Sequence, residues 1–298
     1  MIRGSWKPPS TWPSGGFLSA LPGAFFVVAL IVANVSAPAA SEFAGSEMCL
    51  TCHEEAAQSL GHRGSDAKDP RCESCHGPGL AHIEGEGDAS KIVKPGSLEP
   101  AESAKLCLSC HEKGGARHWN IGVHESADLT CLSCHKLHNP EGTHAHLLSN
   151  PAEQEVCFTC HKMQRVQTMR SSHMPVREGK LVCSDCHNPH GSTTEGMLSS
   201  PSVNDNCYRC HAEKRGPTLF EHPPVRENCL NCHDPHGSIH ESLLVSKVPR
   251  LCQNCHINSR HPSEPRVAAS RFVFNKGCVN CHTNVHGSNH PAGIRQQR

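Results

Sequence analysis

Ten copies of the pattern Cys-x-x-Cys-His lie along the chain and account for all 20 of its cysteines. Two thiols with two residues between them, followed by histidine, form the pattern of covalent c-type haem attachment. The thiols form thioether bonds to the haem vinyl groups, and the histidine binds the iron as its proximal ligand. The sequence therefore predicts ten covalently attached haem c groups.

The residues of the ten motifs fall into three sets. The first cysteines are Cys49, Cys72, Cys107, Cys131, Cys157, Cys183, Cys207, Cys229, Cys252 and Cys278. The second cysteines are Cys52, Cys75, Cys110, Cys134, Cys160, Cys186, Cys210, Cys232, Cys255 and Cys281. The proximal histidines are His53, His76, His111, His135, His161, His187, His211, His233, His256 and His282.

Two other uses of cysteine compete with haem attachment. A disulfide framework is common in exported proteins, but it explains neither the fixed spacing nor the ten histidines. Zinc sites use Cys-x-x-Cys pairs, but each metal needs two such pairs, or one pair and histidines. Haem attachment is the one interpretation that uses every cysteine and every following histidine.

The composition leaves little material for an ordinary apolar core. Aromatic residues make up 4% of the 298 residues, and the chain contains 24 glycines and 22 prolines. Porphyrins can supply the missing apolar surface. We therefore expect a multihaem cytochrome c fold, with short α-helices and coil wrapped around a row of ten haems and little or no β-sheet.

The formal net charge of zero gives no support for a nucleic-acid partner.

Residues 1–40 have the layout of a signal peptide. Arg3 and Lys7 precede an apolar run over residues 24–35, and small residues follow. The run fits the apolar region of a signal peptide, which is about 7–15 residues long, and cleavage is expected between Ala37 and Ser41. A retained membrane anchor is the alternative, although the run is short for a span of about 20 residues. Residues 41–298 are then expected to form a single elongated domain.

The motifs form five repeats of two motifs each. The first motifs of the repeats begin at Cys49, Cys107, Cys157, Cys207 and Cys252, so successive repeats start 45–58 residues apart. A regular period is the signature of a repeat architecture. Five two-haem repeats are therefore expected to extend in one direction.

The histidines outside the motifs keep the same period. One precedes each second motif, namely His62, His124, His173, His222 and His261. One follows each second motif, namely His82, His138, His190, His236 and His286. These ten are the predicted distal ligands, which would make every iron bis-histidine. Five histidines remain, namely His118, His144, His146, His240 and His290, and His118 competes with His124 for one distal role.

Two further observations bear on ligation. Methionine is an alternative axial ligand, but the methionines past residue 40 do not follow the repeat. His190 stands only three residues after the proximal His187, so it cannot reach the opposite face of the same porphyrin. If His190 is a ligand, it serves a different, neighbouring haem.

Secondary structure is expected to be sparse. Short helices are predicted over Glu155–Met163 and Asp205–Lys214, each carrying the first motif of a repeat. Asn188–Gly191 and Asp234–Gly237 combine Asn or Asp with Pro and Gly and predict turns. The motif-free stretch Glu84–Pro100 is expected to be a loop.

Several stretches together resemble one known family. They are CYRCHAEKRGPTLFEHPPVRENCLNCHDPHGS from Cys207, CESCHGPG from Cys72, VCFTCHK from Val156, SSHMPVREGK from Ser171 and CVNCHTNVHGSNHPAG from Cys278. These stretches, with the number and order of the motifs, resemble the MtrA/DmsE family of periplasmic, porin-associated decahaem c-type cytochromes. The resemblance covers about residues 47–293, and its first repeat is the weakest match.

The resemblance implies an electron conduit. Members of that family sit inside an outer-membrane β-barrel porin and pass electrons between periplasmic and extracellular redox partners. The implied partners are the porin, an extracellular multihaem cytochrome or other outer redox partner, and periplasmic or inner-membrane cytochromes. The implied location is the periplasm, in association with the outer membrane. A soluble periplasmic shuttle to a terminal reductase is the alternative, and a catalytic haem enzyme is disfavoured because the histidines suffice to close every iron.

The number of motifs makes a direct prediction about mass. The mature protein should exceed its polypeptide mass by ten haem masses, because each complete motif binds one haem through thioether bonds. Intact mass spectrometry of the matured protein measures this. Replacing Cys49 and Cys52 together with alanine should remove one haem mass, and nine or fewer haems on the unaltered protein would contradict the count.

Overall fold

The computed structural model describes residues 42–62, 72–139, 144–257, 277–291 and 293–295. Contacts divide the chain into two parts, Met1–Ala39 and Ala40–Arg298. The first part, which holds most of the predicted signal peptide, lies outside the described residues, as does the predicted ligand His261. The signal peptide therefore stays a prediction.

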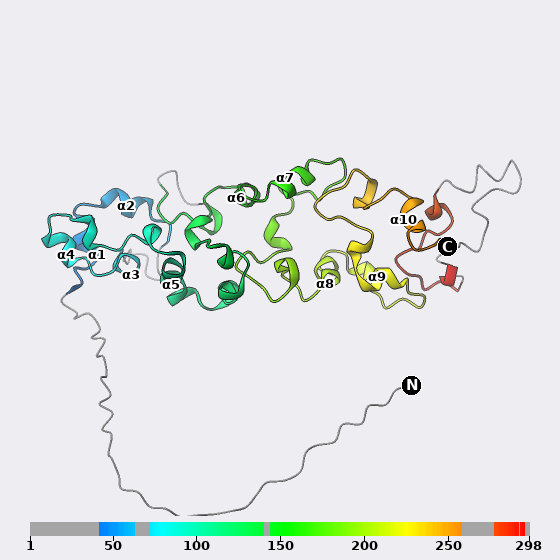
Figure 1. Cartoon of the computed structure of the whole chain (residues 1–298), viewed down its shortest axis with the longest axis horizontal. Helices are drawn as coiled ribbons and strands as arrows, with labels where there is room; N and C mark the ends of the chain where they lie inside the picture. The colour runs from blue at the N-terminus through cyan, green and yellow to red at the C-terminus, as the bar shows by residue number, and fades with distance from the viewer. Residues whose placement is uncertain (1–41, 63–71, 140–143, 258–276, 292, 296–298) are drawn as a thin grey trace, which may run out of the picture. The chain divides into compact units, whose positions relative to one another are not determined.

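The second part of the chain consists of short helices and coil (Figure 1). The α-helices are α1 Ser46–Leu50, α2 Glu54–Ser59, α3 Cys72–His76, α4 Leu80–Glu84, α5 Pro100–His111, α6 Glu153–Phe158, α7 Lys162–Thr168, α8 Val203–Tyr208, α9 Pro223–Glu227 and α10 Arg250–Gln253. The longest, α5, has 12 residues. The described residues contain isolated β-bridges but no strand. The predicted class of short helices with little or no sheet is confirmed.

Each motif is built on one helical turn. In most motifs the backbone N–H of the proximal histidine donates to the carbonyl of the first cysteine, as in His161 to Cys157 and His187 to Cys183, at 2.9 and 3.0 Å. Residues three and four apart lie on one face of a helical turn. The Cys-x-x-Cys-His spacing therefore places both thiols and the imidazole on the same face.

The two motifs of a repeat differ in local structure. First motifs begin inside α-helices, which end one residue after the first cysteine in repeats 1, 3, 4 and 5. The second motifs of repeats 2–5 begin short 3-10 turns at Cys131–Ser133, Cys183–Asp185, Cys229–Asn231 and Cys278–Asn280. The predicted helices over Glu155–Met163 and Asp205–Lys214 are wrong in their extent. Each breaks at its proximal histidine, because His161 (φ −81°, ψ 61°) and His211 (φ −105°, ψ 48°) leave the helical region.

The predicted turns and loop agree with the structure. Gly191 and Gly237 donate their N–H groups to the carbonyls of Asn188 and Asp234, which closes both turns. The stretch between α4 and α5 contains only the 3-10 turns Ala89–Lys91 and Pro95–Ser97.

Isolated antiparallel bridges form two kinds of joint. Within a repeat, the proximal histidine of the second motif bridges to a leucine downstream, as in His187 with Leu198. Between repeats, a residue before one distal histidine bridges to a residue after another, as in Ser172 with Ser238. Because the second kind joins consecutive repeats, it holds the histidines of one repeat against the next.

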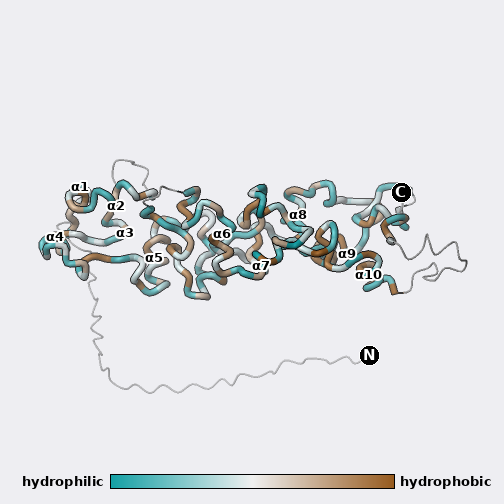
Figure 2. Tube along the Cα trace, turned by 90° about the horizontal axis from the view of Figure 1, so that it is seen from above, coloured by the Kyte–Doolittle hydropathy of each residue, from teal (hydrophilic) through white to brown (hydrophobic). Residues whose placement is uncertain are grey.

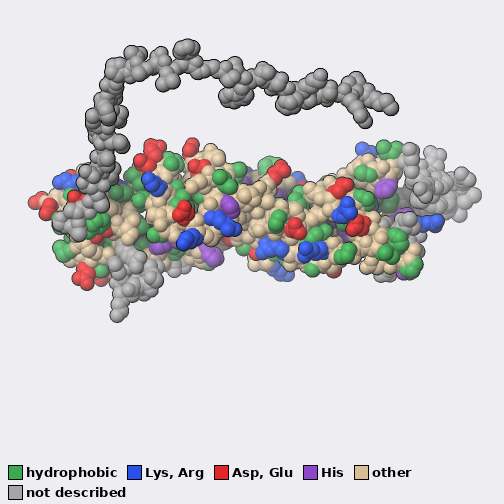
Figure 3. Space-filling view, turned by 90° about the horizontal axis from the view of Figure 1, so that it is seen from below, with side chains coloured by type: hydrophobic (Ala, Val, Ile, Leu, Met, Phe, Trp, Pro, Cys, Tyr) green, Lys and Arg blue, Asp and Glu red, His purple; other side chains and the backbone are tan. Residues whose placement is uncertain are grey.

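The apolar core is small. The buried apolar side chains among the described residues are Ala104, Trp119, Val156 and Phe158. Apolar and polar residues alternate over short distances along the trace (Figure 2). Acidic and basic side chains are both spread over the face drawn in Figure 3. Among the residues that the structure describes, no helix is long and apolar enough to cross a membrane.

Glycines that follow distal histidines allow backbones of neighbouring repeats to meet. Gly237 has φ +142°, and a Cβ added there would overlap the carbonyl oxygen of Gln167 in the preceding repeat. Gly191 meets the carbonyl oxygen of His118 in the same way. Only glycine combines this backbone conformation with this contact.

We predict that Gly237→Ala separates two repeats and lowers the thermal unfolding temperature of the holoprotein. Gly179→Ala is the matched control, because Gly179 also has positive φ (+66°) but an added Cβ there meets nothing within 4 Å. The control should lower the free energy of unfolding only by the cost of a left-handed backbone conformation at alanine, about 1–2 kcal/mol. Equal decreases in the two variants would contradict a packing role for Gly237.

Candidate haem sites

Proximal histidines meet predicted distal histidines in eight pairs of imidazole rings, with ring centres 5.7–6.3 Å apart. The pairs are His53 with His82, His62 with His111, His76 with His138, His124 with His161, His135 with His190, His187 with His236, His222 with His256, and His233 with His286. The structure thus brings together 16 of the 20 histidines predicted as ligands.

The spacing of the pairs fits one metal ion between two rings. Two metal–nitrogen bonds of about 2.0–2.1 Å in line leave the ring centres roughly 6 Å apart. His62 and His111 are slightly closer than the others, at 5.7 Å, with their Nε2 atoms 3.4 Å apart. The arrangement is therefore compatible with bis-histidine iron.

The pairs follow one rule that links neighbouring repeats. A distal histidine that precedes a second motif lies against the first-motif histidine of the next repeat, as His124 does with His161. A distal histidine that follows a second motif lies against the second-motif histidine of the preceding repeat, as His190 does with His135. His53 and His82, both in repeat 1, are the exception.

Backbone carbonyls orient the proximal rings of the second motifs. The Nδ1 atoms of His76, His135, His187 and His233 lie 2.7–2.8 Å from the carbonyl oxygens of Val93, His146, Gly196 and Ser242. A ring that donates its Nδ1–H in this way keeps Nε2 as the free electron pair for a metal. The spacing of the motifs does not predict these carbonyls, although three of them precede a recurring Leu-Leu or Met-Leu pair.

Distal rings are oriented in the same way. The Nδ1 atoms of His82, His124, His138, His173 and His222 lie 2.7–3.0 Å from the carbonyl oxygens of Asp88, Pro189, Ala56, Arg170 and Val285. Three of these carbonyls belong to a different repeat from the histidine. The same contact therefore fixes the ring and joins the repeats.

Four predicted ligands are not brought into pairs among the described residues. His261 lies outside the described residues, and His282 has its Nδ1 directed to the carbonyl of Arg295. The Nε2 of His173 lies 3.2 Å from Glu178, and the Nδ1 of His211 lies 3.6 Å from Glu213. His173 and His211 thus face carboxylates.

The five remaining histidines have other contacts. His124, and not its competitor His118, lies against His161. The backbone of His118 packs on Gly191, and the carbonyl of His146 accepts a hydrogen bond from His135. None of the five takes part in a ring pair in the described part of the chain. The assignment of particular histidines as ligands stays a prediction.

None of the 20 cysteines, all of which lie in the described residues, forms a disulfide, so both sulfurs of every motif are left for haem attachment. A hydrogen bond between Cys107 and Cys131 lowers the pKa of Cys131 to about 7 and raises that of Cys107. Burial and the neighbouring Cys229 raise the pKa of Cys207 to about 11. The first cysteines of the two motifs in a repeat therefore meet, so the two attachment points of a repeat are adjacent.

The motifs surround one continuous cavity of about 4420 Å³, lined by cysteines or histidines of the first seven motifs. A pocket for one small ligand has only about 300–1,000 Å³. The indole Nε1 of Trp119, which also lines the cavity, is buried and has no hydrogen-bond partner among the residues that the structure describes. A propionate of a bound haem is a suitable acceptor for this N–H group, so the residues present fit several haems.

Comparisons with known proteins agree with this chemistry. Residues 173–216 and 222–261 match the doubled CXXCH motif family, and residues 72–150 match the family of NrfB-like cytochrome c-type proteins. A multihaem cytochrome MtrA from Shewanella baltica (strain OS185) is 40% identical over 275 residues, which cover 85% of this chain and 81% of that protein. The chain belongs to the MtrA family of multihaem c-type cytochromes, which transfer electrons on covalently bound haem c.

Proposed function

We propose that this protein holds ten haems with two histidine ligands each and conducts electrons across the outer membrane inside a porin. The observation that carries the proposal is the exchange of histidines between repeats. Ring pairs connect repeat 1 to repeat 2 and so on to repeat 5. A chain that orders its ligands in this way holds its haems in one continuous row.

The same rule assigns the ligands that the structure does not pair. His173 precedes the second motif of repeat 3, so the rule gives it to His211, the first-motif histidine of repeat 4. Its Nδ1 already donates to a backbone carbonyl, as in the paired distal rings. His261 and His282 then complete the set within repeat 5, as His53 and His82 do within repeat 1.

Two histidines on each iron suit a carrier better than an enzyme. Histidine on both faces leaves no open position for a substrate, and it favours lower potentials than histidine with methionine. Electrons can then enter and leave the row without bond making or breaking at the iron.

A row of haems can carry electrons over the thickness of a membrane. The hydrocarbon core of a membrane is about 30 Å thick, which one haem does not bridge. The predicted signal peptide over residues 1–40 takes the chain to the periplasm. The similarity to MtrA supports a porin, an extracellular multihaem cytochrome or other outer redox partner, and periplasmic or inner-membrane cytochromes as partners.

Ligation predicts the effect of removing one distal histidine. His236→Ala should convert one haem from low spin to high spin, with covalent attachment retained, because His236 lies against the proximal His187. Optical and EPR spectra of the purified protein measure the spin state, and mass spectrometry counts the haems. His240→Ala is the control, since His240 is close in sequence but outside the ring pairs. A fully low-spin His236→Ala protein would remove His236 from the ligands.

Conduction predicts a result in sealed vesicles. With its porin inserted, the protein should connect a dye inside to an electron acceptor or donor outside. Replacing Cys157, Cys160 and His161 together removes one central haem and should slow transfer by at least about tenfold, a barrier increase of about 1.4 kcal/mol.

The control for this experiment is Lys162→Ala, which removes an exposed charge beside the same motif. It should leave the rate unchanged. If vesicles with porin and protein conduct no better than vesicles with porin alone, the conduit is wrong and a soluble shuttle to a terminal reductase becomes the better interpretation.

A further inference from the structure

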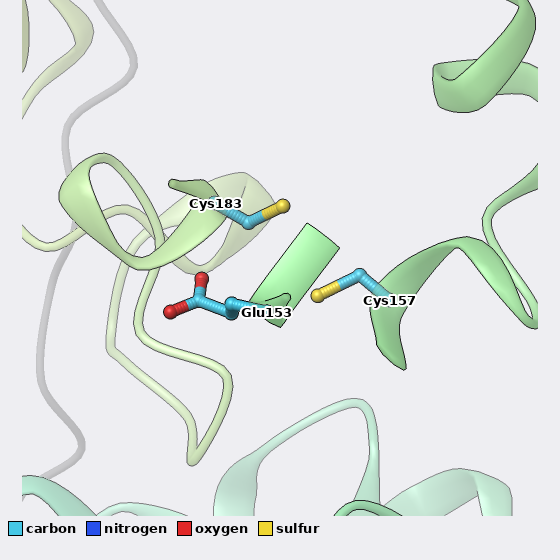
Figure 4. A group of neighbouring side chains, drawn as sticks. All are labelled: Glu153, Cys157 and Cys183. Atoms are coloured by element: carbon cyan, nitrogen blue, oxygen red, sulfur yellow. The ribbon is translucent and has the colours of Figure 1, made fainter. Parts of the chain in front are cut away.

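A single carboxylate stands where the two motifs of repeat 3 meet. The carboxylate of Glu153 and the sulfur atoms of Cys157 and Cys183 all lie within 4.8 Å of one another. Figure 4 shows the three side chains next to one another. Cys157 and Cys183 are the first cysteines of the two motifs, so the carboxylate lies beside both attachment points at once.

The position of Glu153 is fixed by the chain. Glu153 is the first residue of α6, one turn before Cys157. Its two oxygens accept hydrogen bonds from the backbone N–H and the hydroxyl of Ser184, each 2.7 Å long. Ser184 follows Cys183 directly, so these bonds tie the carboxylate to the second motif. The side chain is half-buried, which limits screening of its charge by water and salt.

The negative charge acts on both sulfur atoms. A hydrogen bond with Cys183 and burial raise the pKa of the Cys157 thiol, and the charge of Glu153 raises it further. The hydrogen bond from Cys157 lowers the pKa of Cys183, and the charge of Glu153 acts in the opposite direction. A charge that is felt at both sulfurs is also felt by groups bonded to them.

The other repeats lack a carboxylate at this position. Four residues before the first cysteine, repeats 1, 2, 4 and 5 have Gly45, Ser103, Val203 and Val248. Repeat 1 has a carboxylate nearby in Glu73, but that side chain accepts three backbone N–H groups at 2.7–2.9 Å, from Ala44, Gly45 and Gly79. The charge of Glu73 is nevertheless felt at one sulfur, because it raises the pKa of the Cys49 thiol. Repeats 2, 4 and 5 therefore supply the internal comparison for the charge in repeat 3.

We propose that Glu153 lowers the reduction potentials of the two haems attached in repeat 3. Reduction of Fe(III) to Fe(II) adds one electron, and therefore one negative charge, beside a carboxylate that repels it. The electron comes from the adjoining haem and passes to the next, so a low potential in repeat 3 makes entry into the middle of the row the uphill step in either direction. The inference rests on haem attachment in repeat 3, and not on the porin.

Glu153→Gln tests the inference in the purified, matured protein. Glutamine keeps the size and one oxygen acceptor for Ser184 but removes the charge. In a spectroelectrochemical titration, the reduction potentials of two haems should be higher than in the unaltered protein, and those of the other haems should be unchanged. Intact mass should be unchanged, which separates a change in potential from loss of haem.

Glu155→Gln is the matched control. It removes the same charge from the same helix, but Glu155 lies 3.5 Å from Arg165, whose positive charge offsets it. Its titration should follow that of the unaltered protein, and any small shift should vanish at high salt. The shift in Glu153→Gln should persist at high salt, because Ser184 holds the carboxylate of Glu153 within 4.8 Å of both sulfurs, well inside the screening distance.

A variant that introduces the charge into another repeat tests the inference in the opposite direction. Val203→Glu with Leu230→Ser recreates the Glu153 and Ser184 positions in repeat 4, and it should lower the potentials of two haems there. The inference is overturned if the Glu153→Gln titration overlays that of the unaltered protein, or if Glu153→Gln loses haem mass. Because neither experiment contains a porin, failure in vesicles would leave this result intact.

Discussion

A histidine three residues after a haem-binding motif cannot reach the opposite face of the same porphyrin. The contacts between repeats depend on this constraint. His190 and His236 lie instead against the proximal histidines of the preceding repeats. To deliver them, the backbone of one repeat must touch that of another, which is why glycine follows each of them at positive φ. The isolated bridges between repeats fix the same joints. The exchange of histidines between repeats and the packing of the chain are therefore one feature.

This arrangement makes folding depend on the cofactors. Ordering each residue costs about 1–2 kcal/mol of backbone entropy, and the described residues bury only four apolar side chains to offset it. Under the proposed ligation, apolar faces of porphyrins and iron–histidine bonds supply what the side chains do not, as metals do in small metal-dependent domains. Seven of the eight ring pairs join two repeats, so under the proposed ligation the loss of one of these ligands also weakens a joint between repeats.

The sequence predicted local features correctly, but it did not predict features that depend on how one repeat packs against another. Cys-x-x-Cys-His implied the helical turn, and Asn188–Gly191 implied a turn that the structure contains. The predicted helix over Glu155–Met163 failed because His161 leaves the helical region after the motif. Which histidines meet could not be deduced, since pairing across repeats depends on how the backbones pack. Glu153 was missed because its importance arises from proximity to Cys183, 30 residues away.

The pairing also divides the haem sites into two alternating environments. Second-motif proximal histidines are half-buried and donate Nδ1–H to backbone carbonyls, as His187 does to Gly196. First-motif proximal histidines, such as His161, are exposed, and within the described residues they make no such bond. A hydrogen bond from the outer nitrogen makes imidazole a stronger donor to iron, and solvent exposure also changes a haem potential. The chain therefore alternates two environments from motif to motif, whereas the charge of Glu153 is felt at both motifs of the third repeat.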